Sequence, residues 1–311
     1  MLLCVAAQSP APGAGGAPND ANPYAYDISA FRKVPPEWLR YQEETNFLVS
    51  IVAPAALAVD ASNRVYVAGA NAVAVFDRPD KLSLSFGLER PARCMAVSAS
   101  GDVLIGTADH IDVYSPTGGL RASWVSLGER ALVTSVAARG EHVYVADCGN
   151  HGVWHFDTSG RLKGSIGIMD DGKHFIIPGP SFAVAVAPDE SVWIANPGKC
   201  LVEHYSRDLR FIGQFGEPSM KIEGFCGCCN PTHLAVLPDG RLVTSEKGIP
   251  RIKVYTAAGA LSAVVAGPDL FAPGGTGPDV AADAAGRVLA LDPALATVRI
   301  FSERSKPVAK P

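Results

Sequence analysis

The sequence predicts an all-β protein, a six-bladed β-propeller with a short N-terminal extension. Three observations lead to this fold class. A pattern of two short apolar segments around a turn recurs six times, a third segment ending in an aromatic residue follows each copy, and no helical periodicity separates the copies. Four short strands in about 40–50 residues are typical of one propeller blade.

The six copies align at the turn between their first and second strands. The turn residues are Asn63, Gly101, Gly140, Glu190, Gly240 and Gly286. The aromatic residues that end the third strands are Phe76, Tyr114, Phe156, Tyr205, Tyr255 and Phe301. A weaker fourth strand follows, as in residues 162–166 and 261–265. Aromatic and β-branched residues favour strands throughout these segments.

The ends of the chain differ from the repeats. Residues 1–22 are rich in small residues and predict a disordered tail or a residual export signal with a linker. Residues 23–46 form an extension that packs on the propeller, with a short helix expected in 27–44. The propeller covers residues 47–303, residues 48–52 supply the strand that closes its last blade, and residues 304–311 form a C-terminal tail.

Composition excludes several classes of protein. The chain of 311 residues carries 27 Lys and Arg against 31 Asp and Glu, a net charge of -4 without a basic block, so no nucleic-acid partner is expected. The longest uncharged apolar run, residues 47–59, is too short to span a membrane and contains Pro54. We expect a monomer located in the periplasm or secreted, with an incomplete signal, and a cytoplasmic location stays open.

One blade carries a recognisable motif. Residues 143–162, which begin Val143-Tyr-Val-Ala-Asp-Cys-Gly-Asn150, resemble an NHL repeat. The resemblance implies a bacterial NHL-repeat propeller. That family includes binding scaffolds, lactonase-like hydrolases and amidating lyases, so the fold leaves both binding and catalysis open.

Polar residues end several of the predicted second strands at one rim of the propeller. They are Asp147, Asn196, Glu246 and Asp292, and Lys247 follows directly after Glu246. Carboxylate and amide oxygens suit Ca²⁺ or Mg²⁺, and the resemblance to lactonase-like propellers implies a divalent cation there. The other interpretation is that each side chain caps its own loop through hydrogen bonds to the main chain.

Cysteines gather on the same face in the predicted topology. The cysteines that fall in its loops are Cys148, Cys200, Cys226, Cys228 and Cys229. Cys94 and His233 occupy equivalent positions at the start of two first strands, which line the central channel, so both are expected near its mouth. Basic residues, including Lys247, fall on this face too.

Three interpretations of this cluster compete. Cys148, Cys200, Cys226, Cys228, Cys229 and His233 would bind a Zn²⁺ or copper ion or an iron–sulfur cluster, with redox chemistry as an option. Disulfides would instead lock the loops of a protein-interaction scaffold. Inert packing of small thiols is the third reading. The leading hypothesis is binding of a metal or small ligand at the loop-rich face, with a scaffold and a lactonase-like hydrolase as alternatives.

Overall fold

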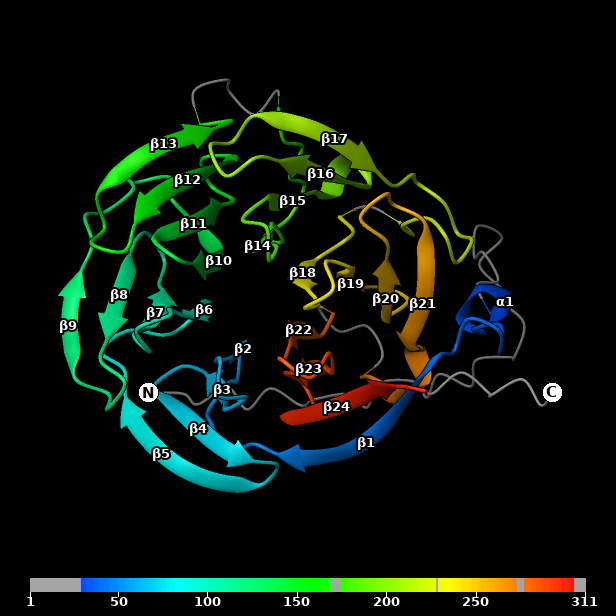
Figure 1. The fold of residues 1–311 in the computed structure, drawn as a ribbon, viewed down its shortest axis with the longest axis horizontal. Helices are drawn as coiled ribbons and strands as arrows, with labels where there is room; N and C mark the ends of the chain where they lie inside the picture. The colour runs from blue at the N-terminus through cyan, green and yellow to red at the C-terminus, as the bar shows by residue number, and fades with distance from the viewer. Residues whose placement is uncertain (1–28, 169–173, 228, 273–276, 305–311) are drawn as a thin grey trace, which may run out of the picture.

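The structure is a computed structural model that describes residues 29–168, 174–227, 229–272 and 277–304. Six four-stranded antiparallel sheets stand around a central channel (Figure 1). This arrangement confirms the prediction of an all-β, six-bladed propeller. The helical segments of the described ranges are short: α1 (Ser29–Arg32), η1 (Pro197–Lys199) and η2 (Pro268–Leu270).

Each blade runs outward from the channel. The innermost strands are β2 (Ala56–Val59), β6 (Cys94–Val97), β10 (Val133–Arg139), β14 (Val184–Val186), β18 (His233–Val236) and β22 (Asp279–Ala282). The second strands are β3 (Val65–Ala68), β7 (Val103–Gly106), β11 (His142–Asp147), β15 (Val192–Asn196), β19 (Leu242–Glu246) and β23 (Val288–Asp292). The second strands lie between two neighbours and are buried on both faces, which explains their continuous apolar sequences.

The outer half of each blade also follows the predicted repeat. The third strands are β4 (Ala72–Arg78), β8 (Ile111–Tyr114), β12 (Gly152–Asp157), β16 (Leu201–Tyr205), β20 (Arg251–Tyr255) and β24 (Thr297–Glu303). The outermost strands are β5 (Lys81–Gly87), β9 (Leu120–Ser123), β13 (Leu162–Ile166), β17 (Phe211–Phe215), β21 (Leu261–Ala266) and β1 (Tyr41–Leu48). The first five outermost strands come from their own repeat, whereas β1 comes from the start of the chain.

All six predicted turn residues adopt a left-handed backbone. Their φ values are +62° at Asn63, +83° at Gly101, +53° at Gly140, +67° at Glu190, +84° at Gly240 and +79° at Gly286. Glycine and asparagine tolerate this region best, so the repeat was visible in the sequence because its turns require it. Glu190 is the exception by residue type, and its carboxylate pairs with Arg207 at 3.2 Å.

The closing strand differs from the prediction. The strand that completes blade six is β1, paired with β24 from Tyr41 opposite Glu303 to Leu48 opposite Thr297, so of the predicted residues 48–52 only Leu48 belongs to it. The propeller therefore begins at Tyr41 rather than at residue 47. An outermost strand buries only one face, and the middle of β1 is polar, with Tyr41 and Phe47 its only fully buried side chains, so the more apolar residues that follow were the wrong guide.

The expected helix in residues 27–44 is also mostly wrong. Of the described part, only α1 is helical, and Pro35 and Pro36 prevent its continuation. The chain then meets blade five, where the Val264 amide donates to the Trp38 carbonyl oxygen at 2.7 Å. The extension thus packs on the outer edge of β21, beside α1 in Figure 1.

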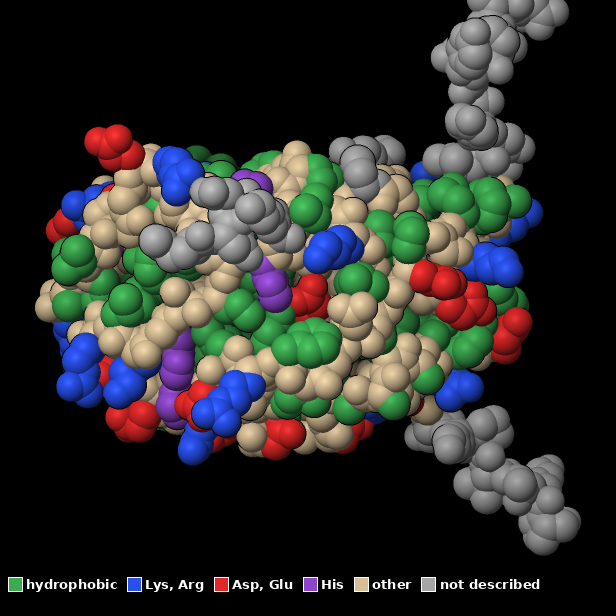
Figure 2. All heavy atoms as spheres, turned by 90° about the horizontal axis from the view of Figure 1, so that it is seen from above, with side chains coloured by type: hydrophobic (Ala, Val, Ile, Leu, Met, Phe, Trp, Pro, Cys, Tyr) green, Lys and Arg blue, Asp and Glu red, His purple; other side chains and the backbone are tan. Residues whose placement is uncertain are grey.

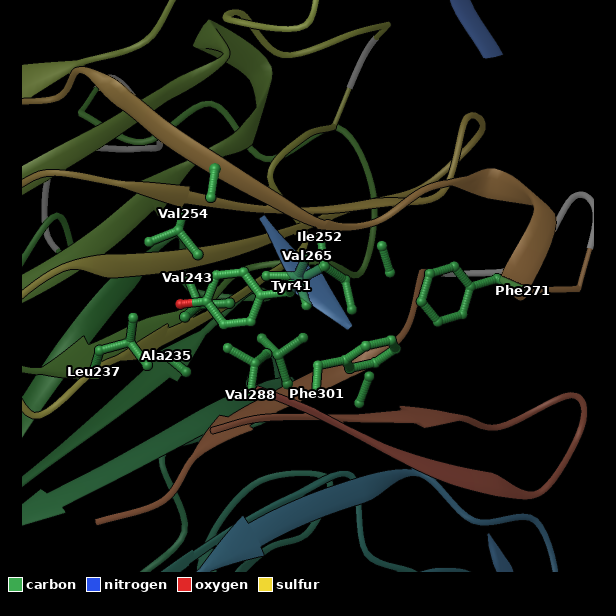
Figure 3. Close-up of a cluster of buried hydrophobic side chains, with 14 residues drawn as sticks. Tyr41, Ala235, Leu237, Val243, Ile252, Val254, Val265, Phe271, Val288 and Phe301 are labelled. Carbon is green, nitrogen blue, oxygen red and sulfur yellow. The ribbon is translucent and has the colours of Figure 1, made fainter. Parts of the chain in front are cut away.

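Apolar side chains fill the interfaces between neighbouring blades. Among the described residues they form six clusters, one for each interface of the ring. Figure 3 shows the cluster between blades five and six, where Tyr41 of β1 lies with Val288 and Phe301 against Val243 and Val265. The closing strand therefore contributes to the core as well as to the sheet.

The outer wall is mixed in character. On the face seen in Figure 2, Lys and Arg side chains are interspersed with Asp and Glu rather than gathered by sign. The outermost strands β13 and β17 expose Leu162, Phe211 and Ile212. Among the described residues, no helix has the length and apolar character needed to cross a membrane.

Candidate functional site

The inner strands begin at the face of the ring where the second strands end. In blade five, His233 at the start of β18 pairs with Ser245 near the end of β19. This face carries the loops after the second strands and the connections between blades, and we call it the loop face. Asp147, Asn196, Glu246 and Asp292 end second strands at this face, and His233 begins an inner strand there.

The channel wall changes character from one end to the other. At the loop face, the first residues of three inner strands are polar: Cys94, His233 and Asp279. At the opposite end the wall is apolar, with Val59, Val97, Ala138, Val186, Val236 and Ala282. A polar ligand without partners is disfavoured in apolar surroundings, so the loop-face end is the one that suits a polar ligand.

A cavity of about 470 Å³ opens at this end of the channel. All six blades contribute to its wall, in order through Ala55, Arg93, Thr134, Ser181, His233 and Asp279. Its volume falls in the range of small-molecule sites, roughly 300–1,000 Å³.

Two cations face the cavity. Arg93 Nε donates to the Val133 carbonyl oxygen at 3.1 Å, which orients its guanidinium. The main chain of Lys247 is held by Asn230, whose side-chain amide donates to the Lys247 carbonyl (3.1 Å) and accepts from its N–H (2.9 Å). In the described ranges no carboxylate lies within 4.0 Å of either charged group. Both positive charges are therefore available to a ligand.

His233 and Asp279 are two titratable groups of the wall that lie close enough for each charge to affect the other. Burial lowers the pKa of His233, and the Asp279 charge opposes that shift. Burial likewise raises the pKa of Asp279, opposed by His233 and by the amides of Leu57 (2.8 Å) and Val280 (2.9 Å) that donate to its carboxylate. Nδ1 of His233 is buried without a hydrogen-bond partner among the described residues. Both groups are thus shifted toward their neutral forms.

Cys94 is a buried thiol in the same wall. Burial raises its pKa well above the ordinary value, with Asp279 adding to the shift and Arg93 opposing it. A β-carbon at Gly106 would lie 2.2 Å from Cys94 Sγ, so only glycine at that position leaves room for the sulfur. Cys94 therefore lines the channel next to Arg93 as a neutral group and not as a thiolate nucleophile.

Two of the predicted loop cysteines lie at the edge of the cavity. Cys148 Sγ donates to the carbonyl oxygen of Gly179 at 3.4 Å. A β-carbon at Gly179 would lie 3.8 Å from both Cys229 Sγ and Lys247 Nζ. The Arg93 charge also opposes the rise that burial imposes on the pKa of Cys148. Cys148 thus lies within reach of the Arg93 charge, and Cys229 and Lys247 lie around the same residue, Gly179.

The remaining cysteines lie elsewhere or outside the description. Cys200 Sγ donates to the Gly227 carbonyl at 3.3 Å, and the N–H of Cys226 donates to Glu246 at 3.2 Å. Cys228 lies outside the described residues. No disulfide joins any two cysteines of the described ranges, and these ranges contain no group of three His, Cys, Asp or Glu side chains placed to hold a metal ion.

The rim residues act locally in the structure. Asp147 accepts from the amides of Leu132 (2.9 Å) and Asn150 (3.1 Å). Asn196 accepts from the Ile176 amide at 2.9 Å, and Asp292 from the Ala272 amide at 2.9 Å. Asp147 and Asp292 also accept from amides of their own loops, those of Asn150 and Ala294, whereas Asn196 bonds the main chain of the preceding connection between blades.

Glu246 has a different environment. It forms ion pairs with Arg251 (2.8 Å) and Lys253 (2.6 Å), and the side chains of all three are at most 1% exposed. Lys253 Nζ also donates to the carbonyls of Ile222 (3.1 Å) and Gly224 (2.6 Å). This buried cluster of two cations and one anion therefore holds the main chain at Ile222, Gly224 and Cys226, where the segment of residues 222–229, which we call the cysteine-rich segment, begins.

Lys253 gives the protein a testable pH dependence. Burial lowers its pKa from 10.5 to about 8, with Arg251 adding to this shift and Glu246 opposing it. Between these values the unfolded chain binds the proton that the folded chain has lost, so this residue makes the free energy of unfolding rise with pH. Urea unfolding of the wild type and Lys253→Met at several values between about pH 8 and pH 10 should show a steeper rise in the wild type. Equal slopes would contradict the assignment.

Two charged residues of the cavity wall, Asp279 and Arg93, were not predicted from the sequence. Asp279 opens the sixth copy of the repeat, as His233 opens the fifth and Cys94 the second, so the alignment alone could have found it. Arg93 directly precedes Cys94 and carried no signal of its own.

Comparisons with known proteins support the fold. No model of a known protein family matches the chain, and no curated protein matches its sequence. A streptogramin B lyase structure aligns with a TM-score of 0.59 and 12% identity over 86% of this chain and 99% of that chain. A catalytically inactive virginiamycin B lyase from Staphylococcus aureus, solved with quinupristin, gives 0.57 and 10% over 84% and 99%. The WD40 propeller domain of Doa1 gives 0.56 and 14% over 81% and 79%.

These likenesses concern the fold alone. Lyases and a WD40 domain are among the proteins of similar architecture, so the architecture does not choose between catalysis and scaffolding. The resemblance of residues 143–162 to NHL repeats stays an interpretation of the sequence. The features that bear on function are therefore the cavity and the charged and titratable side chains that line it.

Proposed function

We propose that the protein binds a small ligand in the cavity at the loop-face mouth of its central channel. The observation that carries the proposal is the convergence of all six blades on one cavity that presents His233, Asp279 and two cations, neither of which has a carboxylate partner among the described residues. A concave site with a few convergent polar groups and shifted pKa values is the arrangement expected of a binding site.

The cysteine-rich segment has a supporting role in this proposal. Asn230, directly after this segment, donates to the Cys226 carbonyl at 2.6 Å and grips the main chain of Lys247 on both sides. Glu246 and Lys253 of the buried cluster also hold the main chain of the segment, through the Cys226 N–H and the Gly224 carbonyl. Through Asn230, the segment therefore helps to position Lys247 at the mouth of the channel.

Filling the cavity tests the proposal. Ala55 is exposed at the channel mouth, and Ala55→Trp places an indole in the cavity without disturbing a buried side chain. Thermal unfolding is measured against a set of small carboxylates, amines, sugars and neutral amides. A ligand present at about 100 times its Kd stabilises the folded state by about 2.7 kcal/mol, which is readily detected.

We expect at least one compound class to stabilise the wild type and to lose this effect in Ala55→Trp. The control is Ala122→Trp, which adds the same indole to the exposed outer strand β9 and should keep the effect. Stabilisation that persists in Ala55→Trp would refute the proposed site, and so would the absence of stabilisation by every class.

A further inference from the structure

We infer that the ligand of the channel mouth is a small organic dianion whose two separated acidic groups pair with Arg93 and Lys247. The inference rests on the proposed function and names the chemistry of its ligand. Its basis is the juxtaposition of two cations, supplied by different blades, on the wall of one cavity.

The two cations come from opposite sides of the ring. Arg93 precedes β6 of blade two, and Lys247 follows β19 of blade five. Both lean toward the blades between them, because Arg93 Nε is bound to Val133 of blade three and Lys247 Nζ lies near Gly179 before blade four. Two charges that flank the cavity in this way suit two acidic groups better than one.

Neither Arg93 nor Lys247 forms an ion pair with another described residue that would account for its charge at this place. The chain is acidic overall, with a formal net charge of -4, so paired basic groups at one cavity do not follow from composition. Arginine binds a carboxylate through two parallel hydrogen bonds, and lysine supplies a compact charge. Ser181, which lies on the wall between them, adds a hydroxyl donor.

The one carboxylate on the cavity wall does not oppose an anionic ligand strongly. Both oxygens of Asp279 accept main-chain N–H groups, from Leu57 and Val280. His233 stands beside it and presents the remaining titratable group of this wall. The negative charge of Asp279 is therefore directed into the wall, whereas neither cation has a carboxylate partner within the described part of the chain.

The main chain around Lys247 is held in place by buried contacts. Lys247 is held at its main chain by the buried Asn230, which is 1% exposed. Gly277 on the same cavity wall has a φ of +85°, and a β-carbon there would lie 3.0 Å from the carbonyl oxygen of Glu246. The chain thus packs tightly just behind the residue that carries the second charge.

A matched set of five-carbon compounds tests the inference by isothermal titration. Glutarate is the probe, pentanoate carries one acidic group, glutaramide is its neutral analogue and 1,5-diaminopentane reverses the charge. We expect glutarate to bind about tenfold or more tightly than pentanoate, as one charge-assisted hydrogen-bonded pair implies. Glutaramide and the diamine should show no binding under the same conditions.

Variants assign the binding to the two cations. Arg93→Gln and Lys247→Gln should each weaken glutarate binding by about tenfold or more. The controls Arg210→Gln and Lys81→Gln remove exposed charges away from the cavity and should leave the affinity unchanged. Circular dichroism and thermal unfolding of each variant establish that the fold is kept.

The outcomes separate this inference from the proposed function. If glutaramide binds as tightly as glutarate and Ala55→Trp abolishes both, the mouth is a ligand site but its ligand is not a dianion. If glutarate binds and neither Arg93→Gln nor Lys247→Gln weakens it, or if no acidic compound binds, the inference is overturned. If glutarate binds equally well to Ala55→Trp, the cavity itself is the wrong site.

Discussion

Replacing Glu246 by glutamine should lower the free energy of unfolding by about 3–5 kcal/mol. Glu246 is the single anion of a buried cluster that also holds Arg251 and Lys253, and Gln leaves both cations without a counter-charge. An uncompensated buried charge costs much more than the loss of an exposed ion pair. Urea unfolding at neutral pH, with a linear extrapolation to water, measures the change.

Two further variants control this experiment. Glu303→Gln removes an exposed carboxylate that pairs with Arg241 at 2.8 Å, and the expected loss is about 1 kcal/mol or less. Adding Lys253→Met to Glu246→Gln removes one of the stranded cations, so the double variant should recover part of the lost stability. A loss at Glu246→Gln no larger than at Glu303→Gln would show that the cluster does not behave as a buried ion network.

The closing strand should be equally important. Tyr41 and Phe47 are the buried residues at the two ends of β1, and they enter the clusters on the two sides of blade six. Each change to alanine should cost about 3–5 kcal/mol, and the two sites lie far enough apart for their costs to add. The double variant should therefore lose most of the stability of a typical domain, which is about 5–15 kcal/mol.

The same strand supplies the control for that experiment. Gln42 and Asn46 lie on the exposed face of β1, so Gln42→Ala with Asn46→Ala should change the free energy of unfolding by about 1 kcal/mol or less. Guanidinium unfolding followed by circular dichroism compares the two pairs. If both pairs give the same small loss, β1 does not close the ring in the way that its register with β24 indicates.

The sequence was sufficient for the fold because the repeat imposes local requirements. Each turn needs a left-handed residue and each third strand ends in a buried aromatic, so both features recur visibly. The strand β1 has no such mark: it lies outside the repeats and is mostly polar, whereas residues 49–52 after it form no strand. Its pairing depends on ring closure, which is a property of the whole chain.

The candidate site was predicted only in part. Equivalent positions in the repeat predicted that Cys94 and His233 begin inner strands at the loop-face end of the channel, and the same alignment includes Asp279. The partners of Glu246 follow from the hairpin of β19 and β20, in which Glu246 pairs with Arg251 and Thr244 with Lys253. The orientation of Arg93 and the placement of Lys247 could not be predicted, because both depend on contacts between different blades.

A crystal structure of the protein soaked with glutarate tests the central claim most directly. The account predicts one glutarate in the cavity at the loop face, with one carboxylate on Arg93 and the other on Lys247. Electron density for glutarate only outside the cavity, at the apolar end of the channel or along the outer strands, would contradict the claim that the channel mouth is the ligand site.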